Sequence, residues 1–502
     1  MRYKLLSLLL SLTALATHAQ EAFVEVSGKA SSGSFAPLWL SSNRQGTVSP
    51  YANSAYERIA YKHEIDFGKS NATADNAERK DWHVAADADI MLAQNAQQNF
   101  FIHQLYGEIS YKKATLVFGQ KERQVDFRNN RLTSGGLSQG INAQPIPEVL
   151  LDIDYFSIPF CNHWWKWHGR IGYGKTTDGN WQKKWIGNTS KDRYTTNYLY
   201  HEKVIGWKIG DESRFPLVFE PNLLMMTQFG GTTYNITGRN HDDASVPIVH
   251  SENLNAFWHA FWPMGSNDET DGNMSNAAGN TIGSYNFALS WYGRGWKVRG
   301  YYERLFEDQS MLTVQYGLFD HLAGVDAELP KNPYVSHVLI EHMSTKDQAG
   351  PIYHDKSPNM PESYTGIDNY YNHNLYPGWQ SYGMTIGNPL LTSPIYNQYH
   401  ELKFYNNRVT AWHIGLDGNP AEWLAWRVLA TFTRNWGTYD TPLDDVRNQQ
   451  YLMAEATVSP RRLKEWQATL GIGYDHGDLD MIGNSFGAQL TIRKTFNFKK
   501  QR

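Results

Sequence analysis

The chain has 502 residues, a formal net charge of −4 and one cysteine, Cys161. A single cysteine excludes an intramolecular disulfide scaffold, and the lack of a basic excess argues against a nucleic-acid partner. Aromatic residues make up 14% of the chain, yet its mean hydropathy is only −0.55. This combination favours strands with one polar and one lipid-facing side, as in a transmembrane β-barrel, with a large soluble β-protein as the alternative.

The first residues predict export. The chain starts Met-Arg-Tyr-Lys, followed by an apolar run from Leu5 to Ala16 and small residues up to Ala19. A basic start, a short apolar core and small residues at the cut are typical of a secretory signal peptide. We therefore expect residues 1–19 to be removed and residues 20–502 to form a single outer-membrane β-barrel.

Strand-like runs follow one another along the rest of the chain. In the run 283–294, Phe287 and Leu289 lie on one face, while Asn286 and Ser290 lie on the other. A period of two residues with one apolar and one polar face is what a barrel wall requires. The runs cover 22–30, 55–67, 81–92, 99–112, 114–120, 148–160, 165–175, 196–208, 217–229, 283–294, 296–306, 316–328, 332–344, 400–406, 408–417, 422–436, 450–459, 465–475 and 484–498.

The number of these runs is odd, whereas a bacterial single-chain barrel needs an even number of strands. At least one run is therefore no strand, and 114–120 and 400–406 are the weakest candidates. We expect an all-β fold, a transmembrane outer-membrane β-barrel of about 18 antiparallel strands, with 16 and 20 as alternatives. A short helical element and long extracellular loops complete the expected fold.

Connection lengths support this fold. The long connections all follow odd-numbered runs, so they lie at the same end of an up-and-down sheet. Most connections at the other end are tight. This asymmetry is that of outer-membrane barrels, which have short periplasmic turns and long extracellular loops. The long connections are 31–54, 121–147, 176–195, 230–282 and 345–399, and only 68–80 and 437–449 are longer than this scheme predicts.

One segment departs from the strand pattern. From Leu254 to Trp262, apolar residues recur at helical spacing, with Ser251 as a candidate N-cap and Pro263 as a stop. We expect a short amphipathic helix that packs into the barrel mouth or lumen, and an aromatic loop without a helix is the alternative. The last run ends in Phe496 and Phe498, which suits recognition by the outer-membrane barrel assembly machinery.

Sequence motifs for catalysis are lacking. There is no Gly-x-Ser-x-Gly elbow, no His-Glu-x-x-His pair and no phosphate-binding glycine loop. Asp87 and Asp89 share one strand face, where we expect lumen carboxylates paired with Arg or Lys rather than an acid–base pair. Cys161 follows Pro159 at a turn, which argues against a nucleophile. We predict that the protein is not an enzyme and needs no cofactor or metal.

The segment 362–391 is the strongest candidate for binding. It is dense in Tyr, Asn and Gly, has no helical or strand periodicity, and sits in a connection long enough to expect a function. Sugars present apolar C–H faces and many hydroxyls, so their sites combine aromatic faces with planar donor and acceptor groups. The predicted polysaccharide-binding residues are Tyr364, Asp368, Asn369, Tyr370, Tyr371, Asn372, His373, Tyr376 and Trp379, with Arg123 and Arg128 from 121–147.

Each of these assignments has a structural alternative. The aromatic segment could instead fold over the barrel and plug it. The arginines could form salt bridges with lumen carboxylates instead of contacting an acidic sugar. Trp181 and Trp185 could stack on a sugar, whereas Trp164, Trp165 and Trp167 fit an interfacial aromatic girdle better.

Several distinctive segments occur in order along most of the mature chain, at 35–46, 118–121, 132–147, 200–203, 344–348, 368–371 and 386–390. Together these segments resemble the Bacteroidetes branch of the Wzi family of capsule-assembly outer-membrane proteins. The resemblance implies a closed barrel of about 18 strands with a helical element. It also implies a lectin-like, non-enzymatic role in attaching capsular polysaccharide to the cell surface.

The sequence therefore predicts a cell outer membrane protein that binds capsular or other surface polysaccharide. We expect a monomer whose other partners are outer-membrane lipid and the assembly machinery. A porin or glycan-uptake channel is the main alternative, and it predicts an open lumen. An outer-membrane enzyme acting on lipid or glycan is a second alternative, for which the sequence offers no convergent catalytic group.

Overall fold

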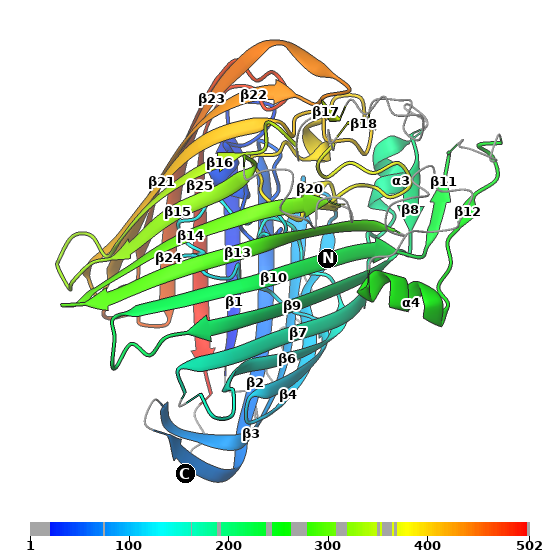
Figure 1. The fold of residues 1–502 in the computed structure, drawn as a ribbon. Coiled ribbons are helices and arrows are strands. Elements are labelled where there is room, and N and C mark those ends of the chain that lie inside the picture. Colours follow the sequence, from blue (N-terminus) through cyan, green and yellow to red (C-terminus); the bar gives the residue numbers. More distant parts are fainter. Residues whose placement is uncertain are drawn as a thin grey trace.

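The computed structural model describes residues 21–73, 76–161, 163–187, 192–236, 243–262, 279–307, 319–348, 352–353, 364–365 and 369–498. The expected signal peptide, residues 1–19, lies outside these residues. Within them, 18 strands form one antiparallel sheet in which each strand pairs with the next along the chain (Figure 1). The first strand, β1 (Glu21–Ser31), also pairs with the last, β25 (Ser485–Asn497), and this pairing closes the barrel.

The strands between these two alternate in direction around the wall. They are β2 (Ser54–Thr73), β3 (Asn76–Gln94), β4 (Phe100–Tyr111), β5 (Ala114–Gln120), β6 (Glu148–Ser157), β7 (Trp165–Lys175), β9 (Leu199–Ile209), β10 (Leu217–Phe229), β13 (Asn280–Gly293), β14 (Trp296–Glu307), β15 (His321–Glu328), β16 (His337–Ser344), β21 (Val409–Ala421), β22 (Leu424–Gly437), β23 (Pro442–Val458) and β24 (Trp466–Gly477). The prediction of about 18 strands is confirmed.

The apolar face of the wall points outward. In β13, Phe287 and Leu289 are 40% and 50% exposed, whereas Ser284 and Ser290 on the other face are fully buried. A soluble sandwich would bury the apolar face instead. An outward apolar belt around a closed barrel is the arrangement that a lipid bilayer requires, because every backbone group is paired within the wall. The chain is an outer-membrane β-barrel.

The two ends of the barrel differ as expected. The long connections 32–53, 121–147, 176–198, 230–279 and 345–408 meet at one end, and hairpins such as 112–113 and 294–295 close the other. Figure 1 shows the small helices and strands gathered at the long-loop end. In outer-membrane barrels this end is extracellular.

Two segments predicted as connections, 68–80 and 437–449, are extensions of the neighbouring strands, and both differ from the prediction for the same reason. The segments 68–80 and 437–449 are mostly strand, because β2 and β3 continue to Thr73 and Asn76 and β23 begins at Pro442. Beyond the lipid, both faces of a strand meet water. The backbone ladder can then continue through polar residues without an apolar face, and the alternation that marks a membrane strand disappears.

The run that is no strand is 400–406, an extended segment outside the ladder, whereas 114–120 is β5. Its alternation is real. Leu402 and Phe404 are fully buried against other loops, while Lys403 and Tyr405 are partly exposed. A segment packed on one side only shows the same period of two as a strand, so the pattern alone could not separate them.

The connections at the extracellular end carry short elements of their own. They comprise helices α2 (Leu38–Ser41), α3 (Trp181–Ile186) and α4 (Leu254–Phe261), the turn η3 (Pro394–Tyr396), a sheet of β8 (Tyr194–Thr196), β11 (Thr232–Tyr234) and β12 (Ile248–Val249), and the hairpins β17 (Ile352–Tyr353) with β18 (Tyr364–Thr365) and β19 (Gln380–Ser381) with β20 (Met384–Thr385). No helix among the described residues is long and apolar enough to cross a membrane.

Candidate functional site

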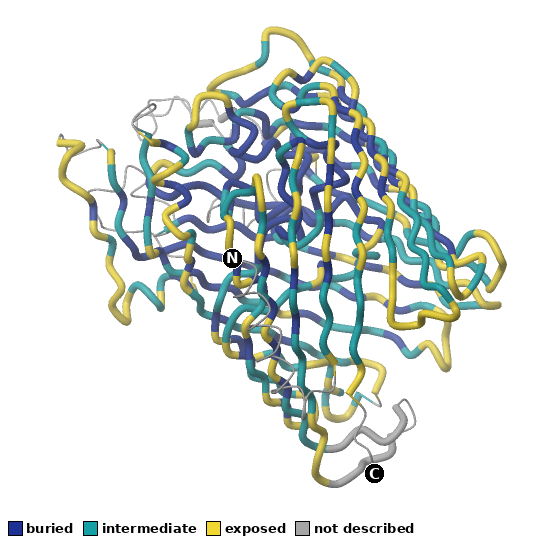
Figure 2. Tube along the Cα trace, turned by 180° about the vertical axis from the view of Figure 1, so that it is seen from behind, coloured by how far each residue is buried: buried dark blue, intermediate teal, exposed yellow. Residues whose placement is uncertain are grey.

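Three connections fold inward and interlock in the lumen. We call 32–53, 121–147 and 369–398 together the plug. Its parts are joined by backbone hydrogen bonds, in which Gln45 N donates to Ile141 O at 2.7 Å and Gly140 N donates to Ile386 O at 2.8 Å. Figure 2 shows the buried chain concentrated inside the barrel toward the long-loop end.

The plug has an apolar core that a water-filled lumen would lack. Trp39, Leu132, Leu137, Trp379 and Leu391 have 0–1% of their surface exposed and belong to one cluster with inward side chains of the wall. Burying side chains of this size stabilises a packed arrangement by about 1.5–3 kcal/mol each. The loops therefore fill the lumen as a folded core rather than lying loosely over it.

Two glutamates on the lumen wall hold the plug by charge and hydrogen bonds. Glu303 on β14 pairs with Arg128 at 2.6 Å and accepts from Leu137 N and Ser138 N at 2.9 and 3.0 Å. Glu341 on β16 accepts from the Thr133 hydroxyl at 2.5 Å. Such charge-assisted hydrogen bonds are roughly twice as strong as neutral ones, so they fix the position of 121–147 on the wall.

The predicted aromatic residues of 369–379 are part of the plug. Tyr370, Tyr371, Tyr376 and Trp379 are 0–3% exposed. The Trp379 indole donates to Ser138 O at 2.7 Å, the Tyr371 hydroxyl donates to Leu137 O, and the Tyr370 hydroxyl donates to Asp320 at 2.9 Å. The structure gives these rings the packing role that the sequence left open. Their contact with a polysaccharide stays a prediction.

The polar residues predicted alongside them lie nearer the surface. Asn369 and Asn372 are partly exposed and bonded to each other at 2.8 Å, and Asn369 also donates to Asp440 at 2.7 Å. The His373 ring accepts the backbone N–H of Leu375 through Nδ1 at 3.1 Å. Tyr364 lies in β18, and Asp368 lies outside the described residues.

Arg123 and Arg128 are both committed to lumen carboxylates. Arg123 contacts Glu148 and Glu202, and Arg128 pairs with Glu303. Burial lowers the pKa of Arg123 to about 10, which still leaves the group charged at neutral pH. These contacts correspond to the salt-bridge alternative considered from the sequence, and polysaccharide binding by either arginine remains a prediction. Asp89, on the lumen face with Asp87, pairs with Arg58 at 2.5 Å as expected.

A second aromatic set remains accessible on the extracellular surface. We call it the aromatic rim, and it consists of Trp185, Tyr194, Tyr234, Tyr399, His400 and Tyr405. Trp185 stacks on His400 with centroids 4.4 Å apart, and Tyr194 stacks on Tyr234 at 4.8 Å. Tyr399 is 56% exposed and lies 5.5 Å from Tyr405. Exposed aromatic faces held in stacks are suited to the C–H faces of a sugar.

Hydrogen bonds between loops hold the rim in place. His400 Nδ1 donates to Trp185 O at 3.0 Å, and Asp192 accepts from Leu402 N at 2.7 Å. The Tyr405 hydroxyl donates to Glu401. Burial and this hydrogen bond raise the pKa of Tyr405, so its hydroxyl stays protonated. The rim thus combines rigid aromatic faces with carboxylate and hydroxyl groups from separate loops.

The sequence pattern identifies only part of the rim. Trp185 is a candidate stacking residue because of the tryptophan cluster around it. Tyr399 and Tyr405 escape detection, since 400–406 has the pattern of a strand and 399 falls just beyond the segment 362–391. Tyr194 and Tyr234 lie in connections far apart along the chain. Only the pairing of β8 with β11 brings these two rings together.

A polar cavity of about 310 Å³ lies in the lumen on the periplasmic side of the plug. Its charged lining groups are all paired, Arg44 with Glu455 at 2.6 Å, Arg493 with Glu25 at 2.5 Å, and Arg58 with Asp89, which is not part of the lining, at 2.5 Å. Compensated charges of this kind give no net attraction for an acidic ligand. Within the described residues, no group of three or more His, Cys, Asp or Glu side chains could hold a metal ion.

Helix α4 exists as expected, but its position differs from the prediction. Its N-cap is Asn253, whose side chain accepts from Ala256 N at 3.0 Å, rather than Ser251. The helix lies against the outer face of the wall and not in the mouth or lumen, because Phe257 contacts Tyr173 and Thr227 donates to Ala260 O. Apolar residues on both its faces fit a lipid-bathed position better than a lumen. Pro263 lies outside the described residues.

No protein-family model and no curated protein sequence matches this chain. Among solved structures, it is similar to Wzi, an outer membrane protein involved in group 1 capsule assembly in Escherichia coli and a carbohydrate-binding β-barrel. The alignment covers 97% of this chain and 87% of Wzi, with a TM-score of 0.55 and 13% identity. OccD3 and OprD of Pseudomonas aeruginosa align over 96% and 95% of this chain and 91% and 94% of their own, both with a TM-score of 0.45 and 8% identity. The similarity to Wzi supports the fold alone.

Proposed function

We propose that this protein is a plugged outer-membrane barrel that binds capsular or other surface polysaccharide at the aromatic rim. In this role it attaches or organises the capsule without acting as an enzyme and without a cofactor. The observation that carries the proposal is the division of its aromatic residues. One set seals the lumen, and a second set is stacked and accessible on the extracellular surface.

The resemblance of several segments to Wzi-type capsule-assembly proteins supports the same role. The similar fold of Wzi, which binds carbohydrate, agrees with it. We infer that this chain is a distant member of that family, of the Bacteroidetes type. On this view, the barrel wall and plug form a rigid platform, and the extracellular loops that carry the rim determine which polysaccharide is bound.

A channel for ions or glycans is the second candidate. The apolar core of the plug argues against it, because side chains such as Trp379 and Leu391 occupy the lumen. The wild-type protein in planar bilayers is therefore expected to show little ion conductance. A large, stable conductance would favour the channel.

The binding proposal is tested with the capsular polysaccharide of the producing cell and the purified barrel. The double variant W185A/Y399A should lower the affinity about fivefold or more, since each aromatic contact contributes roughly 0.5–1.5 kcal/mol. Trp412→Ala is the matched control, because this tryptophan is 57% exposed on the membrane face and lies away from the rim. Equal binding by all three proteins would contradict a role for the rim.

Capsule retention on cells separates direct attachment from an indirect role. Cells with the W185A/Y399A variant should release polysaccharide into the medium, while those with Trp412→Ala should retain it. Deletion of 362–391 tests the binding segment predicted from the sequence. Its effect is expected to include loss of the plug and hence a rise in conductance. An intact capsule after this deletion, together with no binding by the purified protein, would rule out the proposed function.

A further inference from the structure

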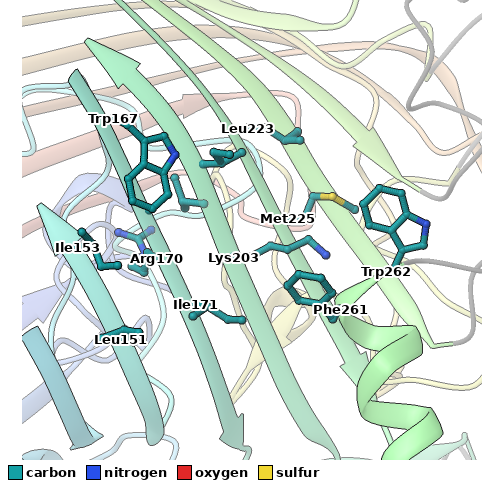
Figure 3. A pocket seen from close by; sticks show the side chains of 13 residues that line it. Leu151, Ile153, Trp167, Arg170, Ile171, Lys203, Leu223, Met225, Phe261 and Trp262 are labelled. Carbon is teal, nitrogen blue, oxygen red and sulfur yellow. The ribbon is translucent and has the colours of Figure 1, made fainter. Parts of the chain in front are cut away.

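A groove of about 480 Å³ opens on the outer face of the barrel wall, beside α4 (Figure 3). Strand pairing places its lining on the lipid side. Ile171 on β7 and Met225 on β10 lie opposite Lys203 on β9, and Ile205 beyond them is 40% exposed. The neighbours of Lys203 in β9 face the lumen instead, where Glu202 pairs with Arg170 at 2.8 Å.

The groove is apolar except at Lys203 and at Arg170, whose guanidinium is paired with Glu202 in the lumen. Leu151, Ile171, Leu223 and Met225 form its sides, and Phe261 and Trp262 at the end of α4 close its extracellular end. Lys203 projects into it, as Figure 3 shows. Toward the periplasmic end it reaches Trp167, which pairs in register with Trp207. Lys203 and Trp207 are four residues apart on β9, which corresponds to roughly 13 Å of strand at about 3.3 Å per residue.

The Lys203 ammonium has no hydrogen-bond partner among the described residues, and its nitrogen is buried. It contacts the Phe261 ring, whose centroid lies 4.6 Å from Nζ. An ammonium carries three N–H donors, which a ring face cannot satisfy. A lysine on the lipid-facing surface of a barrel costs about 2–4 kcal/mol at the midplane and only about 0–1 kcal/mol near the interface, so a partner matters most where the side chain is deepest. An anion that enters from the lipid side would satisfy these three donors.

The surroundings of the groove indicate where this anion comes from. Lys203 is the fifth of the eleven residues of β9, which begins at Leu199 at the extracellular end. Leu254, Trp258 and Trp262 on α4 are 89%, 56% and 61% exposed. Since α4 packs on the outer wall, these side chains continue the apolar belt of the barrel into the membrane interface. The groove opens on the lipid side, and Lys203 is the charged side chain that points out of the wall into it, beside the aromatic residues of α4.

We propose that this groove binds one phosphorylated lipid of the outer leaflet. An acyl chain lies along Leu223, Ile171 and Leu151, and a headgroup phosphate accepts hydrogen bonds from Lys203 beneath the end of α4. The lipid would fix α4 and the start of the connection 230–279 at the membrane surface. This site is separate from the aromatic rim and does not depend on polysaccharide binding.

Native mass spectrometry of the purified full-length barrel in detergent tests the proposal. The probes are diphosphorylated lipid A, the same lipid with its phosphates removed, and inorganic phosphate. The wild type should retain one diphosphorylated lipid A and bind the dephosphorylated form about fivefold to tenfold more weakly, the share of one lysine–phosphate contact. Inorganic phosphate alone should neither bind nor compete, because it lacks the acyl chain.

Two variants and a control separate the parts of the site. Lys203→Gln should bind both lipid forms equally, and Leu223→Trp, which fills the groove, should lose both. Lys494→Gln is the control, because Lys494 also lies over aromatic rings on the outer wall, 5.3 Å from Trp466, at the periplasmic end. The proposal is overturned if Lys203→Gln keeps the preference for phosphate, if Leu223→Trp binds like the wild type, or if phosphate alone displaces the lipid.

Discussion

The plug and the aromatic rim use the same residue types in opposite ways. In the plug, Tyr371 and Trp379 are almost fully buried, and each polar atom donates to a backbone carbonyl of 121–147. In the rim, Trp185 is only partly buried, stacked against Trp181 and His400, and Tyr399 is 56% exposed. A buried ring contributes packing and a satisfied hydrogen bond, whereas an open ring leaves apolar surface available for a ligand. Aromatic density alone therefore marks neither a core nor a binding site.

This comparison predicts that damage to the plug changes stability and conductance, and damage to the rim changes binding. The largest effect is expected from Glu303→Ala, which leaves the Arg128 charge buried without its partner and removes the carboxylate that accepts from two backbone N–H groups. Breaking a buried pair in this way costs up to about 5 kcal/mol. Conductance in planar bilayers should rise as the plug loosens.

The control for this variant is Glu212→Ala, since Glu212 forms only an exposed pair with Lys208 at 3.4 Å. That substitution should change neither conductance nor unfolding. If Glu303→Ala behaved like Glu212→Ala, the plug would not depend on its charged anchors, and the contrast between plug and rim would weaken.

Trp379→Ala is expected to have the next largest effect. The substitution leaves a cavity in the plug and removes the hydrogen bond to Ser138 O, at a cost of about 3–4 kcal/mol. Hydrogen exchange should increase in 121–147 and 369–398 but not in the wall strands. Unchanged exchange in 121–147 would mean that the two connections are not coupled through this ring.

Lower pH should loosen the plug at its extracellular edge. Burial, with a smaller effect of Arg193, lowers the pKa of His373 from 6.5 to about 3. The folded segment then binds fewer protons than the unfolded one, so its stability falls as the pH drops from about 6.5 toward 3. The loss at pH 5 is about 2 kcal/mol, because a tenfold change in proton affinity corresponds to roughly 1.4 kcal/mol.

Hydrogen exchange of 369–380 at pH 7 and pH 5 measures this effect. In the neutral ring, His373 Nδ1 accepts hydrogen bonds from Leu375 N and Tyr376 N. Protonation of Nδ1 removes the lone pair that accepts them. His373→Asn is the control, because its side-chain oxygen can still accept a hydrogen bond but does not titrate. A pH response of equal size in this variant would show that another group is responsible.

The smallest effect on stability is expected for Trp185→Ala. Trp185 is partly exposed and stacks on His400 and Trp181, so its removal should cost about 1 kcal/mol. Polysaccharide affinity should nevertheless fall severalfold, while Trp379→Ala reduces stability far more. A loss of stability as large as that of Trp379→Ala, measured by thermal unfolding, would place Trp185 in the core and not in a binding surface.

The barrel wall could be predicted well because its signal is local. A membrane strand must alternate every two residues, and turn lengths alternate with it, so 283–294 or 148–160 could be recognised without knowing their partners. The strand predictions were wrong where the two-residue alternation did not coincide with a membrane strand. Beyond the lipid the alternation faded, as in 68–80, and 400–406 alternated because it packs on one side against the plug.

The sequence by itself determined the alternating membrane wall and the asymmetry of its two ends, and it narrowed 254–262 to a short helix or an aromatic loop. Only the tertiary structure decided which aromatic residues are buried, where the helix lies and which arginines are paired. The physical reason is the large separation in sequence between the residues that make these contacts. Contacts such as Trp379 with Ser138 and Arg128 with Glu303 join residues 241 and 175 positions apart, and no periodicity within either segment encodes the partner.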